Sequence, residues 1–196
     1  PIADVDTARP RLWENEVNRR KTITLWYRLA ERYRDEPWIG GYDLINETNY
    51  PLDGNVALRQ FLTEITAAIR MVDTNHIIFI EGNHFATDFE GLTPPWDSNM
   101  VYSFHKYWNP TTVETIQKFL DIRETHNVPL WMGESGENNN EWYRSAVQLF
   151  EADSIGWAWW TLKKLGSESG IMNVAIPDGY QQIIDYWNGS GPAPSP

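Results

Sequence analysis

The stretch Trp38-Ile-Gly-Gly-Tyr-Asp-Leu-Ile-Asn-Glu-Thr-Asn-Tyr50 is an apolar segment that ends abruptly in Asn46-Glu47, before a turn-rich loop. This pattern predicts a buried strand with a carboxylate at its exit. A strand end is rigid and the loop after it is exposed, so its last side chain can reach a ligand. Glu47 is therefore a candidate catalytic residue, although a single strand-end glutamate is more often a salt-bridge or helix-cap partner.

Similar apolar strands recur along the chain and alternate with amphipathic segments. The expected strands are 38–46, 76–83, 100–108, 129–136 and 155–162, and the expected helices are 17–33, 55–72, 112–125, 141–152 and 181–187. Such alternation predicts right-handed crossovers and a parallel sheet. No glycine-rich fingerprint or Walker A motif follows any of these strands, so a nucleotide-binding sheet is disfavoured and no cofactor is expected.

Composition narrows the classes of partner. The 196 residues are 41% apolar, which suits one domain with a substantial core. The formal net charge of -11 leaves no basic patch for nucleic acid or anionic membranes, so a neutral or cationic substrate fits better. Eleven Trp, nine Tyr and seven Phe could build either an aromatic core or a sugar-stacking site. With no cysteine and four scattered histidines, neither a disulfide nor a metal site is expected.

The C-terminal residues have the composition of a linker. They run Asn188-Gly-Ser-Gly-Pro-Ala-Pro-Ser-Pro196, where glycine and serine loosen the chain and proline stiffens it. We therefore predict a catalytic domain over residues 1–187 and a linker over 188–196. The chain begins with Pro1 instead of an initiator Met, which suggests a processed or excised piece. It shows neither a signal peptide nor an apolar run of the roughly 20 residues that a membrane span requires.

The ends of the predicted strands carry polar and aromatic side chains. In chain order these are Asn46, Glu47, Glu81, Asn83, His105, Tyr107, Glu134 and Trp160. Parallel barrels gather the C-terminal ends of their strands at one face, where active sites lie. Glu47 and Glu134 would then supply what glycosidic bond cleavage needs, namely a proton donor and a carboxylate that attacks the sugar or activates water.

Four strand-end motifs follow one another in this order. They are Tyr42-Asp-Leu-Ile-Asn-Glu47, Tyr102-Ser-Phe-His-Lys-Tyr107, Trp131-Met-Gly-Glu134 and Gly156-Trp-Ala-Trp-Trp160. As a set they resemble the motifs of glycoside hydrolase family 5, the cellulase and endoglucanase family, over about residues 12–187. The resemblance implies an α/β fold of the (β/α)8 TIM-barrel type and retaining hydrolysis by double displacement. It makes Glu47 the acid/base and Glu134 the nucleophile.

The resemblance also implies roles for the residues around this pair. Asn46 would bind the 2-hydroxyl group of the sugar that is attacked. Tyr107 would donate a hydrogen bond to the nucleophile, and His105 would join the polar network. Trp160 would form the stacking floor of the same subsite.

The resemblance defines the substrate and the partners less narrowly than it defines the catalytic residues. Asn83 and Trp108 lie beyond strand ends and would either line further subsites or pack within loops. The third motif strand favours an endo-β-1,4-glucanase acting on β-glucan. A β-mannanase, another family 5 β-glycanase, or an inactive polysaccharide-binding or assembly fragment are the alternatives. The family and the linker together imply a secreted, extracellular protein.

Two features depart from the family pattern. Thr48 stands where the family usually has proline, which affects only the loop. More importantly, the chain holds only about five strand-helix units, whereas a (β/α)8 barrel takes about 250 residues. We therefore predict a partial barrel, about strands 4 to 8 with their helices. Its open edges should lead it to self-associate or to pair with a missing N-terminal half.

Overall fold

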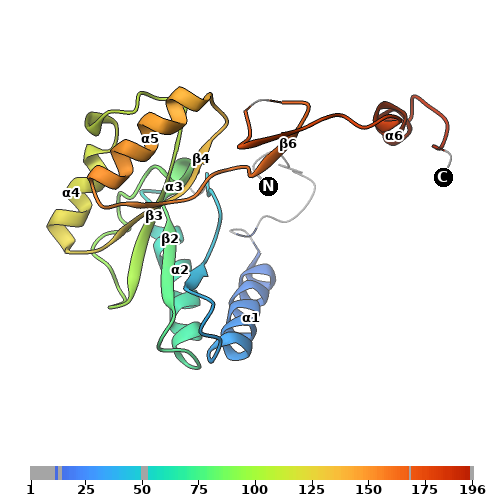
Figure 1. Cartoon of the computed structure of the whole chain (residues 1–196). Coiled ribbons are helices and arrows are strands. Elements are labelled where there is room, and N and C mark those ends of the chain that lie inside the picture. The colour runs from blue at the N-terminus through green and yellow to red at the C-terminus, as the bar shows by residue number, and fades with distance from the viewer. Residues whose placement is uncertain (1–11, 13–14, 50–52, 168, 195–196) are drawn as a thin grey trace.

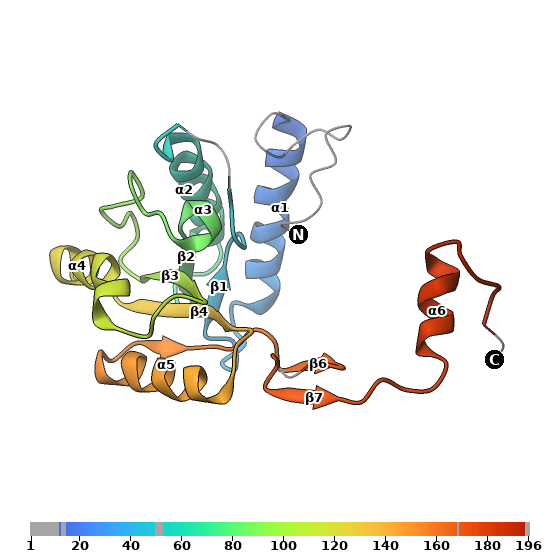
Figure 2. The same cartoon turned by 90° about the horizontal axis from the view of Figure 1, so that it is seen from above.

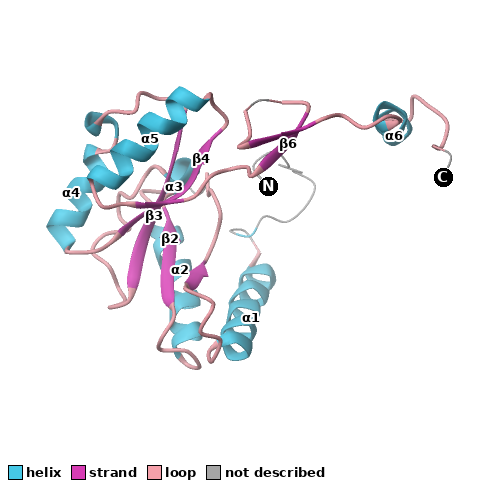
Figure 3. Ribbon diagram, in the orientation of Figure 1, coloured by secondary structure: helices cyan, strands magenta, loops and turns pink. Residues whose placement is uncertain are grey.

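The computed structural model describes residues 12, 15–49, 53–167 and 169–194. Five parallel strands form one sheet in chain order, with helices on its outer side (Figures 1 and 3). The strands are β1 (Gly41–Asp43), β2 (Ile77–Glu81), β3 (Met100–Tyr107), β4 (Leu130–Gly136) and β5 (Gly156–Trp157). The main helices are α1 (Glu16–Tyr33), α2 (Val56–Arg70), α4 (Gln117–His126) and α5 (Asn140–Ala152). The chain is thus a partial (β/α)8 barrel, which confirms the predicted fold.

The core lies between the sheet and its helices. Side chains alternate along a strand, and on β2 Ile78 and Ile80 face the helices and are fully buried. The residues between them, Ile77 and Phe79, are only half-buried. They line the inner face of the sheet, which no strand covers from the opposite side in the described part of the chain. β2 is therefore apolar on both faces, but the helices cover only its outer face.

α1 covers the outer side of the first edge strand. Its Trp26 indole N–H donates to the carbonyl of Leu44, 3.1 Å away. Arg19 pairs with Glu64 of α2 at 3.2 Å, and the two helices lie side by side in both views (Figures 1 and 2). These contacts fix the end of β1, and with it the loop that carries Glu47.

A β-bulge adjusts the pairing of β3 with β4. Phe104 pairs with Met132, but the next pair is His105 with Glu134, so Gly133 is an extra residue on β4. Strict alternation from buried Met132 would turn Glu134 toward the helices. The bulge instead brings Glu134 to the inner face beside His105, because it shifts the alternation by one residue.

The strands at both edges are shorter than the sequence predicts. β1 has three residues and β5 has two, and Trp38, expected to start the first strand, is 92% exposed. An edge strand has a neighbour on one side only, so fewer residues meet a partner. Beyond β5 the chain forms an unpredicted two-stranded sheet of β6 (Lys163–Leu165) and β7 (Met172–Val174).

The last helix, α6 (Tyr180–Trp187), has no buried residue. It stands away from the barrel in both views (Figures 1 and 2), and its Trp187 is 73% exposed. The described part of the predicted linker, residues 188–194, contains no helix or strand. In the described residues, no helix has both the length and the apolar character that crossing a bilayer requires.

Candidate active site

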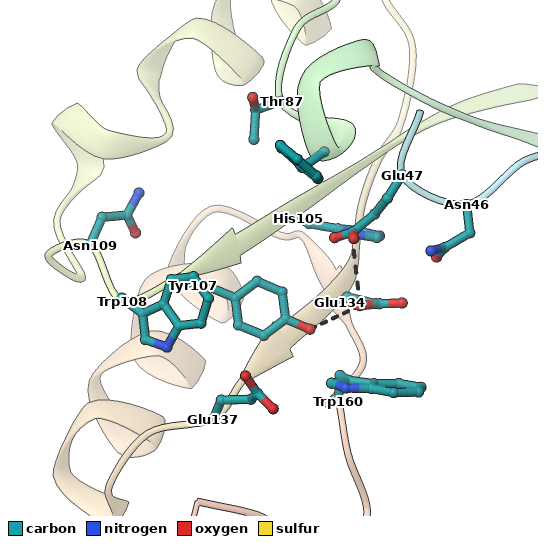
Figure 4. Close-up of a pocket in the computed structure, with 11 residues that line it drawn as sticks. Asn46, Glu47, Thr87, His105, Tyr107, Trp108, Asn109, Glu134, Glu137 and Trp160 are labelled. Carbon is teal, nitrogen blue, oxygen red and sulfur yellow. Dashed lines mark hydrogen bonds and ion pairs between the residues drawn. The ribbon is translucent and has the colours of Figure 1, made fainter. Parts of the chain in front are cut away.

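A pocket of about 860 Å³ opens at the C-terminal ends of the strands (Figure 4). Its lining residues come from the strand ends and the loops that follow them. They are Asn46, Glu47, Phe85, Thr87, His105, Tyr107, Trp108, Asn109, Glu134, Glu137 and Trp160. The structure thus gathers every predicted site residue except Asn83 around one cavity.

Glu47 enters the pocket from the loop after β1. Its φ of 43° is left-handed, and its backbone N–H donates to Glu81 Oε2 at 2.5 Å. Its carboxylate Oε1 lies 2.6 Å from Nδ1 of His105, which β3 supplies. The side chain of Glu47 is 7% exposed, so both contacts are shielded from water.

Glu134 lies across the pocket from Glu47, near the end of β4 (Figure 4). The Tyr107 hydroxyl donates to its Oε2 at 2.9 Å, and Nδ1 of His105 lies 3.9 Å from the same oxygen. Burial raises the pKa of Glu134, and the negative charges of Glu47 and Glu81 add to the increase. The Tyr107 hydrogen bond and the His105 charge oppose it, because they stabilise the ionised carboxylate.

His105 is the cation at the centre of this cluster. Burial lowers its pKa, but contacts with Glu81 and Glu47 and the charge of Glu134 outweigh burial and raise the pKa to about 9. Asp43 lies on the edge strand β1 and is exposed, and its carboxyl group interacts with Glu81, His105 and Glu134. Burial among these groups, followed by the charge of Glu81, raises the pKa of Asp43 to about 8.

The two glutamates and the histidine lie very close together. One ligand atom from each of Glu47, His105 and Glu134 falls within 4.8 Å of the others, a spacing that could hold a metal ion. The same atoms already bind one another or Tyr107: His105 contacts Glu47, and Tyr107 donates to Glu134. The arrangement therefore suits proton transfer between closely spaced carboxyl groups as well.

Aromatic rings supply the walls of the pocket. Trp160 is 53% exposed and is held by its backbone N–H, which donates to Ser135 O at 2.7 Å. Trp108 is 69% exposed, and its ring lies 5.3 Å from that of Tyr107. Asn46 stands at the rim next to Glu47 (Figure 4). Exposed flat rings beside polar groups are a surface on which a sugar ring can stack.

Asn83 is the predicted site residue that the structure does not bring to the pocket. It begins the short helical turn α3 (Asn83–Ala86) and is 3% exposed. Its amide donates to Asn55 Oδ1 at 2.7 Å, and its Oδ1 accepts from the N–H of His84 at 2.9 Å. Its side chain therefore holds loops together instead of facing the cavity, because the chain turns sharply after β2.

Several lining residues were not predicted from the sequence. Phe85 and Thr87 follow β2, Asn109 follows β3, and Glu137 follows β4. All four lie in loops or turns, where no hydrophobic alternation marks a side chain's direction. Glu81, which the sequence places at a strand end but to which it gives no role, is buried and does not line the pocket.

Comparison with known proteins agrees with the fold and the pocket. The family model "Cellulase (glycosyl hydrolase family 5)" matches residues 5–166. The chain therefore belongs to glycoside hydrolase family 5, as its motifs suggested, and the members to which it is similar are glycoside hydrolases. It is 26% identical to a β-xylosidase of Phanerodontia chrysosporium over 219 residues, covering 93% of this chain and 45% of that protein. It is 22% identical to endoglucanase C of Acetivibrio thermocellus, covering 80% and 63%.

Among solved structures the chain is similar to endoglucanase Cel5A of Thermotoga maritima. The TM-score is 0.69 at 21% identity, with 82% of this chain and 63% of that one covered. Cel5A has been solved with mannotriose and with cellobiose. The chain thus spans between about half and two thirds of the length of these relatives.

Proposed function

We propose that this chain carries the active site of a retaining endo-β-1,4-glucanase that cleaves β-glucan by double displacement. Glu134 is the nucleophile and Glu47 the acid/base. The observation that carries the proposal is the separation of the two carboxylates, with one oxygen of each within 4.8 Å. Retaining enzymes need about 5–5.5 Å, whereas inverting enzymes leave about 6.5–9.5 Å for a water molecule.

In the first step Glu134 attacks the anomeric carbon while Glu47 gives its proton to the departing glycosidic oxygen. Tyr107 aims the nucleophile through its 2.9 Å hydrogen bond and favours the ionised form. Once the sugar ester forms, Glu134 has lost its charge and no longer repels an ionised Glu47. Glu47 then removes a proton from water, which attacks the ester and releases the sugar with its configuration retained.

The remaining pocket residues would bind and orient the sugar. Trp160 offers a flat, exposed face below Glu134 (Figure 4), which suits stacking under the sugar that is attacked. Asn46, which lines the pocket, would bind the 2-hydroxyl group. Trp108 would extend the aromatic surface to a neighbouring sugar. A polysaccharide is thus the proposed partner, and because such polymers are too large to enter cells, we also propose that the protein is secreted.

A β-mannanase or another β-glycanase is the second candidate. It is supported by the two ligands solved with Cel5A, mannotriose and cellobiose, and by the similarity to a β-xylosidase. One methylene or hydroxyl difference between sugars is discriminated weakly unless a buried polar group reads it. A fragment that only binds polysaccharide is a third candidate, because no strands oppose the inner face of the described sheet.

We further propose that the barrel is completed by three more strands, from a preceding segment of a longer protein or from a second chain. The half-covered inner face and the exposed α6 support this, because both leave apolar surface in water. The three added strands would pair with β1 at one edge of the sheet and close the barrel toward β5 at the other edge. They would also enclose the pocket on the side where Asp43 is now exposed.

The test of function is hydrolysis of soluble carboxymethylcellulose, galactomannan and xylan. The chain is assayed alone and with a polypeptide that supplies the first three strands, taken from endoglucanase C. We expect viscosity of the cellulose to fall faster than reducing ends appear, and Glu134→Gln, the control for contaminating enzymes, to be inactive. Faster cleavage of mannan or xylan would favour the second candidate. Retention on a cellulose column without hydrolysis would favour the third.

A further inference from the structure

Glu81 is a buried carboxylate next to the acid/base that the proposed reaction does not use. It ends β2, is 4% exposed and does not line the pocket. A buried carboxylate is unfavourable unless its oxygens are paired. Here Oε2 accepts from the backbone N–H of Glu47 at 2.5 Å, and Oε1 lies 3.2 Å from Nε2 of His105. Both partners belong to the catalytic network.

The first contact holds the backbone of Glu47. Its φ of 43° lies in the left-handed region, which residues other than glycine seldom occupy. Such a conformation persists only where the surroundings enforce it. The carboxylate of Glu81, fixed on a central strand, anchors the amide and so determines where the Glu47 side chain points.

The second contact acts through the imidazole ring. His105 Nε2 forms an ion-pair contact with Glu81 that lacks hydrogen-bond alignment, whereas Nδ1 lies 2.6 Å from Glu47 Oε1. A histidine protonated on both nitrogens can face two carboxylates at once. The charge of Glu81 then compensates the imidazolium, and Glu47 is not left beside an unpaired cation.

We propose that Glu81 is a positioning residue for Glu47, acting through the Glu47 backbone amide and through His105. The kinetic part of this proposal rests on the proposed glycosidase function, but the effect on His105 does not. The ionisable groups that act on His105 come from three strands and one loop. They are Asp43 of β1, Glu47 of the following loop, Glu81 of β2 and Glu134 of β4.

The first test measures histidine titration by NMR in the full chain, with His105→Asn used to assign the signal. The pKa of His105 is expected at about 9 in the unmodified protein. Glu81→Gln should lower it by about one unit or more, because a neutral amide no longer stabilises the imidazolium. The matched control is Asp73→Asn, which alters another buried carboxylate 2.6 Å from a histidine, His76, before the start of β2. A His105 titration that Glu81→Gln leaves unchanged would overturn the proposal.

The second test separates positioning from loss of fold by the choice of leaving group. Phenyl β-cellobioside needs a proton from Glu47, whereas 2,4-dinitrophenoxide leaves without one. Glu81→Gln should lower kcat/KM about 10²-fold for the phenyl substrate and only a few-fold for the dinitrophenyl one. Asp73→Asn should leave both values unchanged. Equal losses on both substrates would overturn the proposal. If the unmodified protein cleaves neither substrate, alone or with the closing polypeptide, the proposed function fails, and the histidine titration alone decides the role of Glu81.

Discussion

At the scale of single residues, Tyr107 is one of the groups that influence whether Glu134, the proposed nucleophile, is ionised. Burial raises the pKa of Glu134, while the hydrogen bond from Tyr107 and the charge of His105 lower it. The attacking carboxylate must be ionised, so activity falls when the pH drops through this pKa. Burial, the Tyr107 hydrogen bond and the charge of His105 together would therefore set the acid limit of the proposed reaction.

Tyr107→Phe removes that hydrogen bond and leaves the ring in place. We expect the pKa of Glu134 to rise further, because the ionised form loses a donor. The acid limb of the profile of kcat/KM against pH should then move to higher pH, and kcat should fall about 10-fold to 100-fold as the nucleophile loses its orientation. The profile is measured on an aryl β-cellobioside. An acid limb that stays in place or moves to lower pH would contradict this role of Tyr107.

At the scale of the elements, one extra glycine on β4 directs Glu134, the proposed nucleophile, into the pocket. Gly133 is the bulge residue that turns Glu134 to the inner face. It also sits tightly, since a Cβ there would come within 2.4 Å of Ser103 Oγ and 3.3 Å of His105 Nε2. Buried Ser103 cannot move aside easily, because the surrounding side chains are closely packed.

Gly133→Ala should therefore destabilise the protein by about 1–3 kcal/mol through overpacking. It should also displace His105, so the NMR signal of that ring is expected to shift. Gly40→Ala is the control, since a Cβ at Gly40 meets no atom within 4 Å. Chemical denaturation of both variants gives the comparison. Equal stability of the two would show that the bulge tolerates a side chain.

The elements also show where prediction from the sequence succeeds. Helices α1, α2 and α5 and strands β2, β3 and β4 lie where their patterns place them, because their apolar side chains recur at helix or strand spacing. The ends of the edge strands β1 and β5 could not be predicted. The alternation of apolar and polar residues does not show whether a strand is paired on one side or on both. Strict alternation would have turned Glu134 away from the pocket. Only its strand-end motif, Trp131-Met-Gly-Glu134, pointed to the site.

At the scale of the whole molecule, the site depends on residues far apart in sequence. Six of the lining residues belong to the strand-end motifs and Trp108 follows one of them, because strand ends converge in a parallel barrel. The positions of the unpredicted lining residues, and the burial of Asn83 away from the pocket, depend on loop conformations that the sequence pattern does not reveal. These include the left-handed φ values of His84 and Phe85, 51° and 59°.

The open side of the half-barrel leads to a prediction about assembly. Apolar side chains are exposed beyond β5 and on α6, and they include Leu162 at 59%, Ile176 at 59% and Trp187 at 73%. We expect light scattering after size-exclusion chromatography to give a mass above the 22.8 kDa of one chain. The closing polypeptide should replace this self-association with a defined complex. A monodisperse monomer with one cooperative unfolding transition would contradict the prediction.

The roles of the two glutamates are tested most directly by azide rescue followed by stereochemical analysis of the product. The assay uses 2,4-dinitrophenyl β-cellobioside and the form of the protein that is active. Glu134→Ala should lose turnover and regain it with azide, which replaces the nucleophile and gives the α-cellobiosyl azide. Glu47→Ala should accumulate the glycosyl ester, which azide attacks to give the β-cellobiosyl azide. The opposite pairing of variant and anomer, or no rescue in Glu134→Ala, would contradict the assignment.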